Sequence, residues 1–243
     1  MDTPDPFGLK LMIVGRRRPG STLAEHRHHI RDVHGERVLR YVATDPDNAP
    51  RRYVQNAVFD GSFRASAPGT DAFALNRDFV TEIWVPDFAA LGRSRETAFY
   101  REHLKGDEDN FVDQATVVFL PVHARVLQPV ATAAFKLFGL VRKAPGVDAD
   151  RFRQAWAQAP AFAPALGHVQ NDVLAAPGPP ATVDGIDEFW LADEAAARSL
   201  AAQWQAWVDD ALVRPGLALA DASFFLIATE AVLHAGTGFP LSS

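Results

Sequence analysis

The sequence contains no cysteine among its 243 residues. This absence excludes disulfide bonds, thiolate nucleophiles and metal sites built from cysteine ligands. A chain without cysteine is compatible with a reducing compartment, and we expect a cytoplasmic protein.

A strong charge of one sign and a long apolar run are also missing. The formal net charge is −6 with histidine neutral, and a mildly acidic balance argues against a general nucleic-acid binder. No apolar run reaches the ~18 residues expected of a membrane-spanning helix. The first residues, MDTPDPFG, are acidic and contain two prolines, unlike a signal peptide. We therefore expect neither nucleic acid nor membrane as a partner.

Several common catalytic motifs are absent. The sequence has no G-x-S-x-G, no P-loop, no G-x-G-x-x-G and no H-E-x-x-H. These absences disfavour a serine hydrolase, an NTPase and a standard dinucleotide enzyme. What is present is apolar bulk, with 17 Phe and 5 Trp, enough for a sizeable core.

Four segments of the first half recur in the second half in the same order. Such a recurrence indicates a duplicated structural unit. The matched pairs are LKLMIVGRRRPG (9–20) with FKLFGLVRKAPG (135–146), YVQN (53–56) with HVQN (168–171), EIWV (82–85) with EFWL (188–191), and TVVFLPVHARVL (116–127) with ASFFLIATEAVL (222–233).

Each half alternates strands and helices in the order βαββαβ, which is typical of a ferredoxin-like α+β module. Ser21 and Asp148 are expected to cap the first helix of each half, and Glu25 to complete a capping box. The sequence thus predicts tandem modules over residues 9–127 and 135–233, joined by a linker, which form a fused dimeric α/β barrel. Two copies that tumble independently are the alternative.

The first half resembles the EthD family. The residues that carry the resemblance are RRRPG (16–20), RDVHGERV (31–38), YVQN (53–56), the D-x-x-x-E-I-W-V strand (78–85) and DEDNFVD (107–113). The resemblance covers residues 9–127 well and residues 135–233 weakly. It implies a dimeric α/β-barrel fold, shared with cofactor-free monooxygenases, muconolactone isomerases, polyketide cyclases and fungal dehydratases, and with some haem-binding proteins.

The resemblance implies a small aromatic, polyketide or lactone-like substrate. We expect a cofactor-independent enzyme that transfers protons, as a lyase, dehydratase or isomerase. A haem-binding protein of the same fold and a non-catalytic metabolite-binding or accessory protein are the alternatives. No metal site is expected, and a homodimer is possible.

His34 is the histidine that matches the family, and we predict that it transfers the proton, because an imidazole can take and return one near neutral pH. The competing interpretation is a histidine that only bonds the helix end beside Gly35. Asp113 is a candidate to pair with His34, and Tyr53 to donate a hydrogen bond to a developing oxyanion. His168, which takes the place of Tyr53 in the second half, is a second candidate for proton transfer.

Three residues are candidates for binding the substrate. Asn56 can orient a carbonyl, and an arginine such as Arg16 can hold a carboxylate. Trp84 is a further candidate, although its recurrence as Trp190 favours a place in the core. Tyr53 and Asn56 are expected on opposite faces of their strand.

Other polar residues are interpreted as structural. Lys10 and Glu82 recur as Lys136 and Glu188, which favours a structural role. The run His26, His28 and His29 has the wrong spacing for a helical metal site, since only one pair lies three residues apart, and it is expected on a solvated face.

The two halves are not expected to be functionally equal. The position of His34 is occupied by Pro160 in the second half, and proline cannot transfer a proton. We therefore predict that the first half carries the main site.

Overall fold

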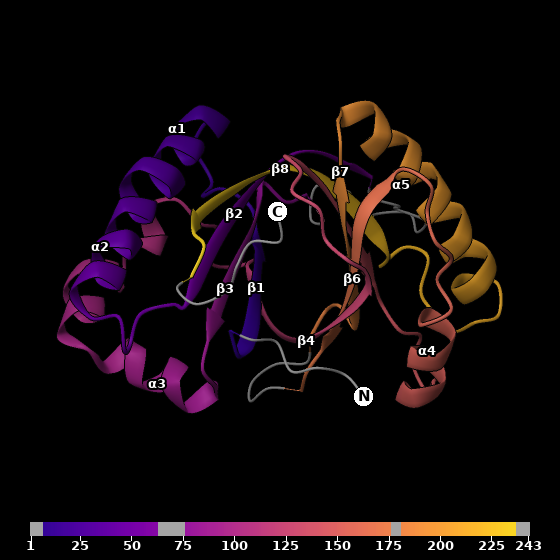
Figure 1. The fold of residues 1–243 in the computed structure, drawn as a ribbon, viewed down its shortest axis with the longest axis horizontal. Coiled ribbons are helices and arrows are strands. Elements are labelled where there is room, and N and C mark those ends of the chain that lie inside the picture. The colour runs from indigo at the N-terminus through magenta and orange to yellow at the C-terminus, as the bar shows by residue number, and fades with distance from the viewer. Residues whose placement is uncertain (1–6, 63–75, 176–180, 237–243) are drawn as a thin grey trace. The chain divides into compact units, whose positions relative to one another are not determined.

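The computed structural model describes residues 7–62, 76–175 and 181–236. Within these ranges, strands and helices follow one another in the order that the sequence predicts (Figure 1). The elements are β1 (Leu9–Gly15), α1 (Leu23–His28), the π-helical segment η1 (His29–Gly35), α2 (Glu36–Thr44), β2 (Arg52–Ser62), β3 (Phe79–Val85), α3 (Phe88–Glu96), the π-helical η3 (Tyr100–Leu104), the 3₁₀ turn η4 (Glu108–Asn110), β4 (Val118–Gln128), β5 (Phe135–Val141), α4 (Ala149–Trp156), β6 (Ala165–Val173), β7 (Gly185–Leu191), α5 (Glu194–Val208), the π-helical η5 (Asp209–Val213) and β8 (Phe224–His234).

The first helix begins one residue later than predicted. Thr22, not Ser21, is the N-cap, and its hydroxyl accepts a hydrogen bond of 3.2 Å from the Glu25 backbone N–H. The Glu25 carboxylate in turn accepts from the Thr22 backbone N–H at 2.8 Å, which completes the capping box. Asp148 caps α4 as predicted.

The strands join into one closed barrel. Their hydrogen-bonded order is β1-β3-β2-β8-β5-β7-β6-β4, and β4 returns to β1. The prediction of tandem ferredoxin-like modules that form a fused dimeric α/β barrel is therefore wrong. An open four-stranded sheet leaves unpaired backbone groups along two edges, and closure of the barrel removes those edges. The residue pattern predicts strands but does not specify which edges pair.

The chain divides into two compact units that are not contiguous in sequence. Unit 1 comprises Met1–Ala57, Arg77–Val122 and Ala231–Ser243, and unit 2 comprises Val58–Asn76 and His123–Glu230. The boundaries divide β2, β4 and β8 between the units. EthD-like modules over residues 9–127 and 135–233 stay a prediction. Among the described residues, no helix is both long and apolar enough to cross a membrane.

Unit 1 places its helices on one face of its strands. Strand β1 pairs antiparallel with β3 and β4, and β3 also pairs with β2. Helices α1, α2 and α3 cover one face of these strands (Figure 1). Because side chains alternate along a strand, every second residue points toward the helices.

The other face of these strands carries buried ion pairs. Lys10 Nζ lies 2.7 Å from Glu82 Oε2, and Asn56 donates its amide to Glu82 Oε1 at 2.8 Å. Unit 2 repeats the pair, with Lys136 Nζ 2.6 Å from Glu188 Oε1. Buried charges of this kind require a partner, which agrees with the structural role predicted for them.

In unit 2, aromatic side chains fill the space between helices and strands. Trp156 of α4 and Trp204 of α5 are fully buried. Both indole N–H groups donate to Asp187 Oδ2, at 2.9 and 2.8 Å. A Cβ at Gly139 would overlap the Trp204 ring, so only glycine at this position of β5 admits the indole. The two indoles and the Asp187 carboxylate thus fill the part of this layer that lies against Gly139.

Candidate functional site

Unit 1 has a cavity between its helices and its strands. It lies between α2, α3 and η3 on one side and β1, β2 and β3 on the other. Counted to its walls and with the open solvent at its mouth included, it encloses about 710 Å³. Its apolar lining residues are Leu11, Ile13, Val38, Pro50, Ile83, Val85, Leu91, Leu104 and Phe119, and its polar ones are His34, Tyr41, Tyr53, Thr81, Ser94, Arg95, Tyr100 and Glu108.

His34 reaches the cavity from the π-helical segment η1. Such segments are frequent at functional sites because the extra residue per turn re-aims the side chains. Gly35 does not end the helix, which continues into α2. A Cβ there would lie 3.1 Å from Leu233 Cδ1 and 3.3 Å from the Ile30 carbonyl oxygen. Glycine therefore allows the turn that carries His34 to approach the strands closely.

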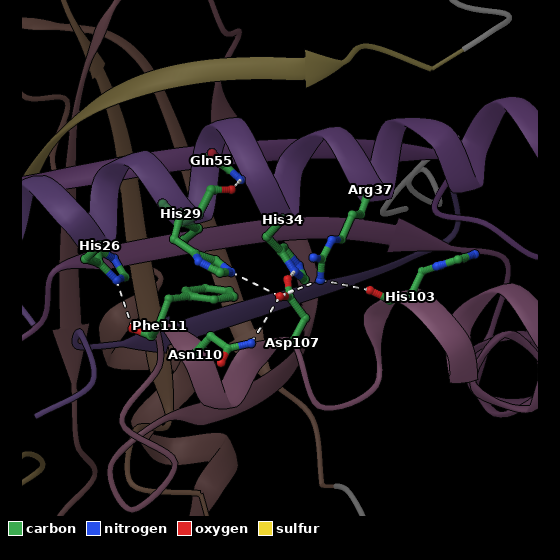
Figure 2. A network of polar contacts seen from close by, with 10 residues as sticks. His26, His29, His34, Arg37, Gln55, His103, Asp107, Asn110 and Phe111 are labelled. Atoms are coloured by element: carbon green, nitrogen blue, oxygen red, sulfur yellow. Dashed lines mark hydrogen bonds and ion pairs between the residues drawn. The ribbon is translucent and has the colours of Figure 1, made fainter.

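Asp107 holds His34 in place (Figure 2). The His34 Nδ1 atom lies 2.9 Å from Asp107 Oδ2. The other carboxylate oxygen lies 3.0 Å from His29 Nε2 and 2.6 Å from Arg37 Nη1. With Nδ1 engaged, the nitrogen of His34 that is left for a ligand is Nε2. Sequence reasoning predicted Asp113 as the partner of His34, and this pairing is wrong.

The Asp107 carboxylate stays ionised. Burial acts to raise its pKa, but hydrogen bonds from His34 and His29 and the charge of Arg37 outweigh burial and hold the pKa well below its ordinary value. Phe111 packs against both imidazoles, with ring centroids 5.1 Å from His29 and 5.0 Å from His34. A fixed negative charge and an aromatic wall thus set the orientation of the His34 ring.

Glu108 is a second ionisable group on the cavity wall. Burial raises the pKa of its carboxyl group, against the opposing charges of His34 and Arg95. A carboxylic acid with a raised pKa in an apolar cavity is a candidate general acid. Sequence reasoning recognised the acidic segment but did not single out this residue. Its place after Asp107, within DEDNFVD, was the available signal.

Tyr53 lines the same cavity as His34. It is buried, and desolvation raises the pKa of its phenol, to which the charge of Glu108 also contributes. Its oxygen accepts a hydrogen bond from Gln55 Nε2, an amide that also donates to the Ile30 carbonyl at 2.6 Å. The phenol remains neutral and keeps its own proton for donation.

Three other predicted residues lie outside the cavity lining. Arg16 Nε and Asp113 Oδ2 form an ion pair at 2.7 Å. Asn56 bonds Glu82 on the opposite face of the strands, as predicted from its alternation with Tyr53.

The two remaining predicted residues are also elsewhere. Trp84 is buried, with Lys10 and Arg52 over its ring. His168 is buried in unit 2, where its Nε2 lies 2.8 Å from Asp187 Oδ1 and its ring stacks on Phe189.

The histidine run does not form one solvated face. His28 is exposed and bonds Asp32, as expected for that interpretation. His26 is buried, with Nδ1 3.0 Å from the Phe111 carbonyl oxygen, and His29 contacts Asp107. The described residues contain no group of three or more histidine, aspartate or glutamate side chains placed to hold a metal ion.

A known domain family covers this site. Residues 18–115 match the EthD domain. The match includes His34, Tyr53, Asp107 and Glu108, and it supports the resemblance drawn from the first half of the sequence. It does not extend to residues 135–233, so a second copy stays a prediction. No curated protein sequence matches the chain.

Two solved structures share the fold. An anthrone oxidase-like protein is 11% identical, with a TM-score of 0.62 over 98% of this chain and 99% of that one. A monooxygenase-like protein from Lactobacillus acidophilus NCFM is 10% identical, with a TM-score of 0.51 over 95% of this chain and 96% of that one. The TM-scores show a common fold. A shared fold at such low identity does not define the reaction, which has to be inferred from the residues of the site.

Proposed function

We propose that this protein is an enzyme that transfers protons without an organic cofactor. The substrate is a small aromatic, polyketide or lactone-like compound, and the reaction is that of a lyase, dehydratase or isomerase. One observation carries the proposal: an imidazole held by an ionised carboxylate and a carboxylic acid of raised pKa line the same apolar cavity. Pairs of groups whose surroundings favour opposite protonation states are the usual acid and base of such reactions.

His34 is the base in this proposal. Its Nε2 atom removes a proton from the carbon next to a carbonyl group, and the positive charge on the ring is stabilised by Asp107. Tyr53 donates a hydrogen bond to the enolate oxygen that develops. Its raised pKa favours the neutral phenol that this donation requires.

Glu108 is the acid. Protonated, it delivers its proton to a departing hydroxyl group, so that water leaves and a carbon–carbon double bond forms. If the proton goes to another carbon of the enolate instead, the product is an isomer. In both cases His34 ends protonated and Glu108 ionised, and transfer of one proton from His34 to Glu108 restores the starting state.

The test compares variants of the two groups with matched controls. Purified protein is assayed on β-hydroxy ketones, unsaturated lactones and poly-β-keto aromatic compounds. His34→Ala and Glu108→Gln are each expected to lower kcat at least ~100-fold. His28→Ala and Glu102→Gln change exposed side chains and should leave the rate unchanged.

The pH dependence gives a second readout. Because the acid must be protonated, the rate should fall as pH rises through the raised pKa of Glu108, and this limb should disappear in Glu108→Gln. A Soret band on the purified protein would contradict the proposal in favour of haem binding. Affinity for compounds of the panel with no turnover of any would favour a binding or accessory protein.

A further inference from the structure

A second hollow of unit 1 borders the same two proton-transferring groups. This hollow of about 320 Å³, counted in the same way, shares His34, Glu108, Thr81, Ile13 and Phe119 with the first. Its remaining walls are apolar, from η1, β3 and the segment before β4. They are formed by Ile30, Phe79, Phe111, Val112 and Val117. His34 and Glu108 therefore lie at the boundary between two compartments.

The first compartment has a permanent cation on its wall. Arg95, near the end of α3, is exposed and lines this compartment. Its charge acts to lower the pKa of Glu108 and of Tyr100 against the effect of burial, and its side chain also forms a hydrogen bond with Tyr100. Within the described ranges, no carboxylate forms an ion pair with Arg95. The guanidinium is thus placed to bind an anionic group at the solvent side of the cavity.

We propose that the substrate is an organic acid with an apolar tail, bound with its acidic group at Arg95 and its tail in the second compartment. This rests on the proposed function, since it places the reacting carbon between the two ends, beside His34 and Glu108. The second compartment has no wall residue beyond the shared ones that could pair with a charge. Arg95, by contrast, has lost little hydration, so a carboxylate or phenolate bound there remains partly solvated.

The binding of stable probes tests both ends of the proposed orientation. Benzoate, 4-ethylbenzoate and 4-butylbenzoate are titrated calorimetrically into the full chain, with 4-butylbenzamide as the uncharged comparison. Affinity should rise with chain length, by about 3- to 4-fold for each buried methylene group. The amide should bind at least ~5-fold more weakly than 4-butylbenzoate.

Two substitutions identify which end of the probe lies where. Arg95→Met should remove the preference for the acid over the amide, whereas Arg93→Met, on the exposed part of the same helix, should not. Val117→Phe should remove the gain from the butyl chain but keep the affinity for benzoate. Ile30→Phe, from a different element, is the second filling variant, and Val126→Phe, an exposed valine in β4, is the control.

The outcomes separate this proposal from the proposed function. Length-dependent, Arg95-dependent binding without turnover of any compound would support the orientation and contradict the enzyme. The protein could instead convert short neutral compounds at a rate that neither Arg95→Met nor the filling variants change. This result would support the proposed enzyme and overturn the proposed substrate orientation. Equal affinity for acid and amide in the unmodified protein, or no gain with chain length, would also overturn it.

Discussion

A single carboxylate organises the site at the scale of residues. Asp107 contacts His29, His34 and Arg37 at distances of 2.6 to 3.0 Å. Its ionised form is stabilised by these contacts, so Asp107 is a positioning residue that acts through His34. The same contacts make it a source of stability that depends on pH.

Replacement of Asp107 by asparagine should change the acid stability of the protein. The pKa of Asp107 in the folded state lies below its ordinary value of 3.8. A depressed pKa contributes stability above the pKa of the unfolded chain and loses it as pH falls toward the folded value. The free energy of unfolding in urea should therefore decline below about pH 4 more steeply in the unmodified protein than in Asp107→Asn.

At neutral pH the same variant should be less stable, by about 1–3 kcal/mol, because buried donors lose a charged acceptor. Asp109→Asn, at an exposed neighbouring position, is the control. Identical pH profiles for Asp107→Asn and the unmodified protein would show that the contacts seen here do not favour the ionised form.

Sequence reasoning found some of these residues and missed others for a physical reason. His34 and Tyr53 belong to local motifs, and both line the cavity. Asp107 lies 73 positions from His34, and no local period links a helix turn to a loop so far along the chain. Asp113, the candidate predicted instead, forms an ion pair with Arg16. These two residues are far apart in the sequence, and only the fold brings them together.

At the scale of elements, the π-helical segment η1 determines where His34 points. The segment lies between α1 and α2 without a break in the helix, and Gly35 closes it against Leu233 and the Ile30 carbonyl group. One interpretation of the sequence placed a helix end beside Gly35, whereas the helix continues through this residue into α2. Glycine is needed here because a Cβ would crowd Leu233 and the Ile30 carbonyl oxygen, and not because the backbone changes direction.

Gly35→Ala should therefore destabilise the protein, whereas a second helical glycine should behave in the opposite way. The added Cβ at position 35 meets neighbours at 3.1 to 3.4 Å, and overpacking of this kind costs about 1–3 kcal/mol. Gly92 in α3 has no neighbour within 4 Å of a built Cβ. Gly92→Ala should stabilise by up to about 1 kcal/mol, because alanine favours the helix.

Thermal unfolding of both glycine variants tests this contrast. If Gly35→Ala were as stable as the unmodified protein, the close approach of η1 to the strands would not be needed for stability. In that case, a lower reaction rate of Gly35→Ala would show that the glycine is needed only to orient His34.

At the scale of the whole molecule, the sequence predicted the order of the helices and strands but not the closure of the strands into a barrel. The recurring apolar segments before each Pro-Gly predicted strands at Leu9–Gly15 and Phe135–Val141. Which strand edges meet depends on pairings between distant segments, which the pattern within each strand does not encode. The divided membership of β2, β4 and β8 in the two units is the consequence.

The helix–strand layers of the two units differ in a way that follows from a few residues. Tyr53 of unit 1 corresponds in the sequence match to His168 of unit 2, and Ile13 to Gly139. Glycine at the second position admits Trp204, whose N–H group bonds Asp187. At the matching positions, unit 1 has a cavity lined by Ile13 and Tyr53, and unit 2 has aromatic rings and a buried polar network around Asp187.

This difference predicts unequal effects of removing His34 and His168. His34→Ala should lower the rate at least ~100-fold if the imidazole is the base. It should lower the melting temperature less than His168→Ala does, because the ring borders a cavity and Asp107 keeps its contacts with His29 and Arg37. His168→Ala should lower the rate much less. It should lower the melting temperature instead, because Asp187 would keep only the donors from Trp156, Trp204 and Gln170 and Phe189 would lose the ring stacked on it.

Rates per folded molecule and thermal midpoints, measured on the same preparations, separate the two effects. Equal losses of rate would mean that both halves contribute to one site, and an unchanged rate in His34→Ala would assign that histidine a structural role.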